Sequence, residues 1–187
     1  QLYFFVYLTL WNSIAIAVVV NYILLVHSQV KIDPLTRLGN RAAYDEQLEI
    51  LSRKENRSLT VVNIDLDDFK IINDIYGHHE GDKVLKIFAK HVKKVFDGKG
   101  ASIRLGGDEF IVLVAEAPEA ACPGGIDALS HLCAGENRDR GAALPPLSIA
   151  AGWALYLPGH EGTSFANTQR LADEQMYRNK REMKERM

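Results

Sequence analysis

The first 30 residues differ from the rest of the chain in their pattern of apolar and polar positions. Between residues 2 and 26 the sequence has 21 apolar and four polar residues, and none of the 22 Lys and Arg or 24 Asp and Glu residues of the chain lies in the first 30 positions. A helix of this length reaches about 37 Å, which exceeds the roughly 30 Å hydrocarbon core of a bilayer. Residues 1–30 are therefore predicted to form one transmembrane helix, in contact with the membrane through residues 2–26.

A buried core helix and a signal peptide are the alternatives for this segment. The apolar run is longer than the apolar region of a signal peptide, and neither a basic leader nor a small-residue cleavage site accompanies it. The nearest basic residues, Lys31, Arg37 and Arg41, all follow the segment and predict that the remainder of the chain is cytoplasmic. Because the apolar run starts almost at Gln1, we expect residues 1–30 to be the last span of a longer membrane sensor.

Residues 31–187 alternate apolar and charged positions with the periods of strands and helices, as in a single α/β domain. Strands are predicted over residues 59–66 and 147–155, a hairpin over residues 101–115, and helices over residues 69–76, 81–96 and 172–187. Asp33 and Asn40 are predicted to cap helices. Gly and Pro interrupt residues 118–146, where we expect only one short helix over residues 126–133.

The overall composition narrows the class of protein. The chain is 47% apolar and 25% charged, with a net charge of −2. These values exclude a disordered, collagen-like or strongly basic chain, and we expect no nucleic-acid partner. Cys122 and Cys133 lack the spacing of a zinc site, so both are expected to be reduced thiols.

Three carboxylates lie at the ends of predicted strands and would converge at one sheet edge if those strands are neighbours. Asp65 lies at the end of the strand over residues 59–66, and Asp108 and Glu109 follow the hairpin turn. Like charges at one sheet edge repel unless a cation offsets them, and oxygen ligands suit Mg²⁺ or Mn²⁺ together with substrate phosphates. The alternative is that the run from Asp65 to Asp68 only caps the following helix and that Gly106 and Gly107 make an ordinary turn; composition alone slightly favours this alternative.

Two further polar residues point to a purine ligand. Asn73 and Asp82 follow Asp65 within 20 residues, on a predicted short helix and its exit loop. An amide and a carboxylate together can read donor and acceptor edges of a base, and a carboxylate that accepts from two N–H groups favours guanine. For Asp82 alone, helix capping is the simpler explanation.

Five motifs together resemble the GGDEF family of diguanylate cyclases. They are DPLTRLGNR at 33–41, DLDDFKIINDIYGHHEGD at 65–82, RLGGDEF at 104–110, LSIAAG at 147–152 and LADEQMYRNK at 171–180. The resemblance covers residues 31–187 and implies a palm-like nucleotidyl-cyclase domain. The implied fold is α/β (α+β), with a mixed, mainly antiparallel central sheet flanked by helices.

The resemblance also implies roles for individual residues. The metal ligands would be Asp65, Asp108 and the backbone carbonyl of Leu66, around two Mg²⁺ or Mn²⁺ ions. Asp108, Glu109 and Lys70 would be catalytic. The substrate-binding residues would be Asn73, Asp82, His78, Gly106, Gly107, Lys180 and Lys184. Lys184 stands where the family often has arginine, so a bidentate phosphate contact is lost there.

The function implied by the resemblance is the condensation of two GTP to cyclic di-GMP and two pyrophosphates. Each domain of the family binds one GTP, so catalysis requires a homodimer, and the location would be the bacterial inner membrane with the domain in the cytoplasm. A catalytically silent module that binds GTP or a partner protein is the alternative. An enzyme of related fold that acts on another nucleotide is a weaker possibility, because Asn73 and Asp82 favour guanine.

Two departures from the family pattern lead to further expectations. The RxxD product-inhibition motif would place arginine and aspartate where this chain has Asp97 and Gly100, so no feedback inhibition is expected through that motif. The junction between Val26 and Asp33 is also short, and it leaves little room for the coiled coil that often joins a sensor to the cyclase.

Overall fold

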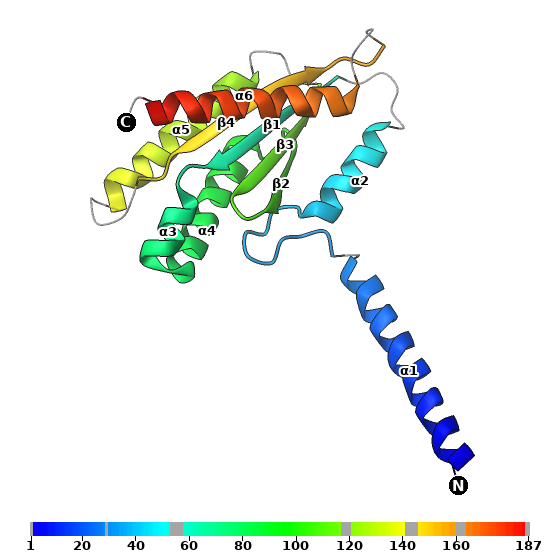
Figure 1. Cartoon of the computed structure of the whole chain (residues 1–187). Helices are drawn as coiled ribbons and strands as arrows, with labels where there is room; N and C mark the ends of the chain where they lie inside the picture. Colours follow the sequence, from blue (N-terminus) through cyan, green and yellow to red (C-terminus); the bar gives the residue numbers. More distant parts are fainter. Residues whose placement is uncertain are drawn as a thin grey trace. The chain divides into compact units, whose positions relative to one another are not determined.

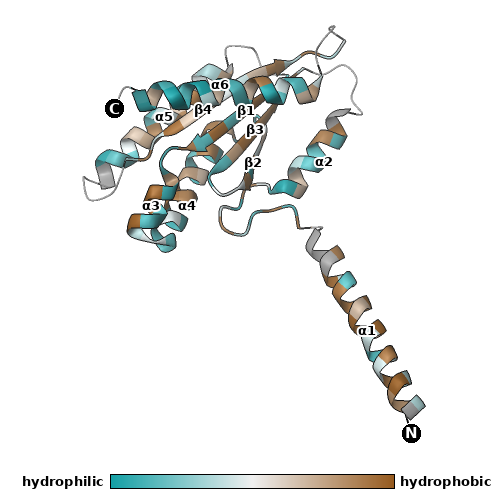
Figure 2. Cartoon of the chain, in the orientation of Figure 1, coloured by the Kyte–Doolittle hydropathy of each residue, from teal (hydrophilic) through white to brown (hydrophobic). Residues whose placement is uncertain are grey.

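The computed structural model describes residues 2–28, 30–52, 58–116, 121–140, 146–159 and 164–185. The chain forms two compact units, residues 1–31 and residues 32–187. The first unit is the helix α1 (Leu2–Ser28). Its segment Tyr3–Ile23 is long and apolar enough to cross a membrane, with a mean hydropathy of 1.9, and Figure 2 shows apolar residues along its length. The predicted helix is therefore present, and its insertion into a membrane remains a prediction.

The second unit is a four-stranded sheet with helices on both faces (Figure 1). Its strands are β1 (Leu59–Leu66), β2 (Ala101–Gly106), β3 (Glu109–Ala115) and β4 (Ile149–Tyr156), in the order β2-β3-β1-β4. Its helices are α2 (Arg41–Ser52), α3 (Phe69–Tyr76), α4 (His78–Phe96), α5 (Ala121–Arg140) and α6 (Phe165–Glu185). All three pairings between these strands are antiparallel. The predicted fold class is confirmed.

The central strand β1 separates two apolar cores. Val62 and Ile64 pack into the larger core with residues of α3, α4 and α5, whereas Leu59 and Val61 pack into a smaller core with α2 and α6. Successive side chains of a strand point to opposite faces, so a strand covered on both faces is apolar at nearly every position. In the larger core, Phe88 of α4 meets Phe110 of β3 edge to face, with ring centroids 4.8 Å apart.

Three local predictions need correction. Asp33 does not cap a helix: its carboxylate accepts hydrogen bonds from the backbone N–H and the hydroxyl of Thr36, which closes a turn. The helix α5 spans 20 residues rather than the short helix expected over residues 126–133. Proline is tolerated there because Pro123 lies in the first helical turn, where its missing N–H has no intrahelical acceptor. The helices α4 and α6 also begin three and seven residues before their predicted starts.

The helix α6 is fixed to the edge strand β4 by side chains that bond the strand backbone. Gln175 accepts a hydrogen bond from the Trp153 N–H at 2.8 Å, and Asn179 donates one to the Ala151 carbonyl at 2.7 Å. Gly152 lies between these two contacts, and a Cβ on it would come within 2.2 Å of the Ala172 carbonyl oxygen. The helix therefore lies against the strand at a distance that only glycine permits.

Substitution of Gly152 should displace α6. The change Gly152→Ala is expected to lower the free energy of unfolding by about 1–3 kcal/mol, because the added methyl group meets backbone atoms that cannot rotate away. The control is Gly124→Ala, whose Cβ would meet no atom within 4 Å in α5, and which should be neutral or stabilising by up to about 1 kcal/mol. Urea unfolding of the full chain in detergent, followed by circular dichroism, measures both, and equal effects would contradict this account of the contact.

Candidate active site

The ends of β1 and of the β2–β3 hairpin bring the three predicted carboxylates to one edge of the sheet. Asp65 lies opposite Glu109 in the antiparallel ladder. The Leu66 N–H bonds the Asp108 carbonyl at 3.3 Å, which places the turn residue beside the end of β1. Asp65 and Asp108 are close enough for the charge of Asp108 to act on the pKa of Asp65. The convergence predicted from the sequence is therefore observed.

The turn of the hairpin is open on its outer side. Gly106 and Gly107 have φ angles of 156° and 52°, and an added Cβ on either would meet nothing within 4 Å. Residues other than glycine rarely adopt these angles, so the two glycines allow the tight turn. The backbone is therefore open beside two carboxylates, and the binding of a phosphate group there stays a prediction.

Arg104 stabilises this turn through hydrogen bonds to its backbone, a role that the sequence did not predict. Its guanidinium donates to the Gly107 carbonyl through Nε at 3.0 Å and through a terminal nitrogen at 2.7 Å. The same group forms a 3.2 Å salt bridge with Asp33. Burial alone would raise the pKa of Asp33, but the hydrogen bonds from Thr36 and the charge of Arg104 outweigh it and hold that pKa below its ordinary value. The ionised Asp33 therefore holds Arg104 in place, and Arg104 in turn holds the hairpin turn.

Lys180 of α6 provides the positive charge at the carboxylate edge. Its ammonium donates to Asp65 at 2.5 Å. Burial raises the pKa of Asp65, and the neighbouring Asp108 raises it further, while Lys180 and the more distant Lys184 act in the opposite direction. For Lys180 itself, burial lowers the pKa, but the Asp65 carboxylate outweighs burial and the pKa is raised. Both lysines predicted to hold phosphates therefore act on the carboxylate edge.

Asp67 is a buried acid that sequence analysis assigned no role. The residue is only 5% exposed, and neither carboxylate oxygen makes a well-formed hydrogen bond with the described residues. Burial raises the pKa of Asp67, and the Ser148 hydroxyl and Lys180 partly oppose the rise. Its position two residues after Asp65, in the DLDD motif, is the sequence signal that could have identified it.

The guanine pair predicted from the sequence is brought together where α3 meets α4. Asn73 is half-buried on α3 and Asp82 is exposed on α4. An added Cβ on Gly81 would come within 2.0 Å of the Asn73 side-chain oxygen, so glycine at this position lets the amide lie against α4. Lys70 and His78 are exposed, and in the part of the chain that the structure describes, no hydrogen bond or ion pair joins them to the other site residues.

The carboxylate edge fits a divalent cation in its donor chemistry. No group of three or more His, Cys, Asp or Glu able to hold a metal occurs among the described residues. The predicted donor set is smaller, with two carboxylates and the Leu66 carbonyl. Mg²⁺ is commonly held by one or two carboxylates, and phosphate oxygens and water complete its shell. The pKa of Asp65 is raised by burial and by Asp108, so the site lacks positive charge that a cation would provide.

A family model described as Diguanylate cyclase, GGDEF domain matches residues 30–186. The chain belongs to the GGDEF family. This GGDEF chain is 37% identical over 166 residues to the diguanylate cyclase DgcP of Pseudomonas aeruginosa, a match that covers 83% of this chain and 23% of the relative. These curated relatives are longer proteins, and the matches span between 12% and 34% of their length.

Solved structures agree with the family assignment. The GGDEF domain of YfiN (TpbB) from Pseudomonas aeruginosa superposes with a TM-score of 0.67 at 33% identity, over 81% of this chain and 89% of that one. The coiled coil and GGDEF domain of DgcB from Caulobacter crescentus, solved in complex with c-di-GMP, gives a TM-score of 0.74 at 22% identity and covers 91% of each chain. At 22% identity, the likeness to DgcB shows a shared fold.

Removal of the Lys180 charge should change how stability depends on pH. In Lys180→Met the pKa of Asp65 should rise further, because burial and Asp108 are then less opposed. When a carboxyl group has a higher pKa in the folded state than in the unfolded state, the free energy of unfolding falls as the pH rises from the unfolded-state pKa to the folded-state pKa. The unfolding free energy of Lys180→Met should therefore fall more steeply above about pH 4 than that of the parent chain.

Two variants control this measurement. Lys180→Arg keeps the positive charge and should keep the parent slope, as should Lys90→Met, which removes an exposed charge on α4. Denaturant unfolding from pH 4 to 7 gives the slopes, and carbon-13 spectra of the carboxyl groups give the pKa of Asp65 directly. A slope in Lys180→Met that equals the slope in Lys90→Met would show that Lys180 does not stabilise the Asp65 carboxylate.

Proposed function

We propose that this chain is the catalytic part of a diguanylate cyclase, which condenses two GTP into cyclic di-GMP and releases two pyrophosphates. The observation that carries the proposal is the edge formed by Asp65, Asp108 and Glu109, with Lys180 bonded to Asp65 at 2.5 Å. Family membership and relatives named as diguanylate cyclases support the same reaction. A silent module would not need to keep these charges together, because like charges without a function cost stability.

The residues divide between the base and the phosphates of GTP. Asn73 and Asp82 would bind the guanine edge at the α3–α4 corner. Lys180 and Lys184 would bind the triphosphate, with Lys70 providing a further charge and His78 lying near the base. Gly106 and Gly107 would let backbone N–H groups approach the phosphates. In these assignments the guanine base lies at the α3–α4 corner and the triphosphate lies beside the carboxylate edge.

The chemical step requires a base beside the reacting phosphate. Asp108 would accept the proton of the attacking 3′-hydroxyl, and Glu109 lies next to it at the start of β3. Asp65, Asp108 and the Leu66 carbonyl would hold the Mg²⁺ or Mn²⁺ ions, two per site. When bound, such ions lower the pKa of the hydroxyl and stabilise the charge of departing pyrophosphate. Lys180 would keep the Asp65 carboxylate ionised so that it can serve as a ligand.

The complete site requires two copies of the chain. One edge of the kind described here holds one GTP, and two 3′,5′ linkages need two nucleotides that face each other. A homodimer is therefore part of the proposal. The apolar helix α1 would anchor the chain in a bacterial inner membrane, with residues 31–187 in the cytoplasm, where GTP is available. Signals received by membrane segments could then alter how two cyclase domains meet.

Incubation with GTP and Mg²⁺ tests the activity. The full chain in lipid nanodiscs should yield cyclic di-GMP by mass spectrometry, and Asp108→Asn should reduce the yield at least about 100-fold, because the isosteric amide cannot accept the proton or neutralise a cation. The matched control is Asp127→Asn on the exposed side of α5, which should leave the yield unchanged.

A second variant tests the guanine contact. Asn73→Ala should remove the preference for GTP over ATP, because Asn73 is proposed to bind the guanine edge.

The state of assembly decides how a negative result is interpreted. Light scattering on the same nanodisc sample establishes whether two chains are present. A dimeric sample that binds GTP and yields no product would favour the silent module over the cyclase. Product formed equally by Asp108→Asn would instead remove Asp108 from the mechanism.

The proposed cyclase should lack product inhibition through the family motif. Asp97, just after α4, stands where the motif has arginine, and Gly100, just before β2, stands where it has aspartate. Neither residue of the motif is therefore present. Cyclic di-GMP should therefore show no tight binding in isothermal titration calorimetry when the nucleotide site is blocked by Asp108→Ala. Tight binding that survives this substitution would contradict the expectation.

A further inference from the structure

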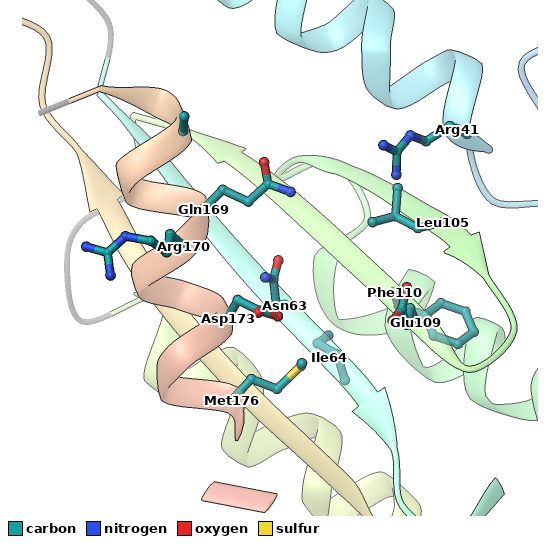
Figure 3. Close-up of a pocket in the computed structure, with 11 residues that line it drawn as sticks. Arg41, Asn63, Ile64, Leu105, Glu109, Phe110, Gln169, Arg170, Asp173 and Met176 are labelled. Atoms are coloured by element: carbon teal, nitrogen blue, oxygen red, sulfur yellow. The ribbon is translucent and has the colours of Figure 1, made fainter. Parts of the chain in front are cut away.

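A cavity of about 460 Å³ lies on the face of the sheet between α2 and α6. Figure 3 shows residues from five elements around it: Arg41 from α2, Asn63 from β1, Leu105 from β2, Glu109 from β3, and Asp173 and Met176 from α6. It lies beside the carboxylate edge and shares Glu109 with it. Neither the guanine pair nor Lys180 lines it.

The cations and one amide at the rim of this cavity already have partners. Arg41 lies over the ring of Tyr44, 5.6 Å from its centroid, and approaches Asp45 at 3.8 Å. Arg170 forms an ion pair with Glu174 and a hydrogen bond to Asn167. The Gln169 side-chain oxygen accepts a hydrogen bond from the Tyr44 hydroxyl at 2.7 Å.

The remaining polar groups are acceptors that lack a donor. The side-chain oxygen of Asn63 is buried and has no hydrogen-bond partner among the described residues. Glu109 and Asp173 form no ion pair with any residue in the described ranges. An unpaired buried amide oxygen costs about 1–3 kcal/mol, so a ligand that donates to it regains this energy.

Asn63 can turn toward the cavity without movement of the backbone. The residue is only partly buried, and rotation about its terminal torsion exchanges the oxygen and the nitrogen of the amide. A cationic donor bound between the two carboxylates favours the orientation that presents the amide oxygen to it. The side chains of Leu105 and Met176 add apolar surface that suits a short methylene chain.

From this arrangement we infer that the cavity binds a small organic cation that carries N–H donors, a guanidinium or primary ammonium on a short alkyl chain. Its cationic group bonds Asn63 and Asp173, and Glu109 contributes negative charge from the opposite strand. A charge-assisted hydrogen bond to a carboxylate is stronger than one between neutral groups, which gives the site its preference for cations. The inference rests on the cavity and its unpaired acceptors; the cavity shares Glu109 with the proposed cyclase site, whereas Asn63 and Asp173, the residues varied in the test, have no role in that site.

Agmatine, which carries a guanidinium and an ammonium on a four-carbon chain, is the probe for this site. Isothermal titration of the full chain in neutral detergent, without divalent ions or nucleotide, should show saturable binding, and glutarate of similar length and opposite charge should show none. Asp173→Asn and Asn63→Ala should each weaken agmatine binding about tenfold, equivalent to about 1.4 kcal/mol. The control Asp127→Asn should bind as tightly as the parent chain.

The unfolding midpoint of Asn63→Ala provides a second measurement that distinguishes a ligand-binding acceptor from a structural one. Removal of an unpaired buried oxygen should leave the stability of the ligand-free chain unchanged or raise it. Loss of stability in this variant would show that Asn63 bonds within the protein, and would overturn the inference. Equal agmatine affinity in Asp173→Asn and in Asp127→Asn would also overturn it, as would no binding at millimolar agmatine.

Titration with MgCl₂ separates the organic cation from a metal ion. The inference expects no Mg²⁺ binding that depends on Asp173, because the site is proposed to select a group that donates N–H bonds to Asn63 and Asp173. Mg²⁺ binding that is lost in Asp173→Asn, with no agmatine binding in the parent chain, would make the cavity a metal site instead.

Discussion

Two carboxylates at one end of a buried strand are the electrostatic constraint on which the geometry of the site depends. β1 is covered on both faces, so Asp65 lies where apolar burial and the charge of Asp108 both raise its pKa. Only α6 places a cation within hydrogen-bond distance of it in the described structure, through Lys180. The close packing of α6 on β4 at Gly152 fixes that cation. A contact between a helix and an edge strand thus stabilises the charge on a residue of the neighbouring strand.

A second charged contact holds the other side of the site. Arg104 joins the Gly107 carbonyl to Asp33, so the hairpin turn is fixed to the segment that precedes α2. Backbone hydrogen bonds strengthen this attachment, because the Gly39 N–H bonds Ser102 and the Arg104 N–H bonds Gly39. The turn that would carry Asp108 to a substrate is therefore held by residues outside the sheet. Displacement of the segment around residue 33 would move the hairpin with it.

Strong periodicity made the strands, the helices α3 and α4, and the convergence of Asp65 with Asp108 predictable from the sequence. Local signals with two meanings were not predictable. Asp-Pro starts a turn as readily as a helix, and hydrogen bonds from Thr36 together with the distant Arg104 select the turn at Asp33. Glycine in α5 indicated a broken helix, yet Gly125 is there because a Cβ would come within 2.8 Å of Phe96. The packing partner decides the role of such a glycine, and a single sequence does not reveal it.

The cavity beside the carboxylate edge could not be predicted because its lining comes from four separate stretches of the chain between Arg41 and Met176. The one local signal was Asn63, a polar residue inside the apolar run of β1. A buried strand tolerates such a residue only if its amide is bonded or if it has a function, because an unpaired amide costs stability. Asn63 lies two residues before Asp65, and side chains two apart share a face of the strand. The same alternation that brings Asp65 to the carboxylate edge therefore brings Asn63 to the cavity, and Glu109, opposite Asp65 in the ladder, lies at both.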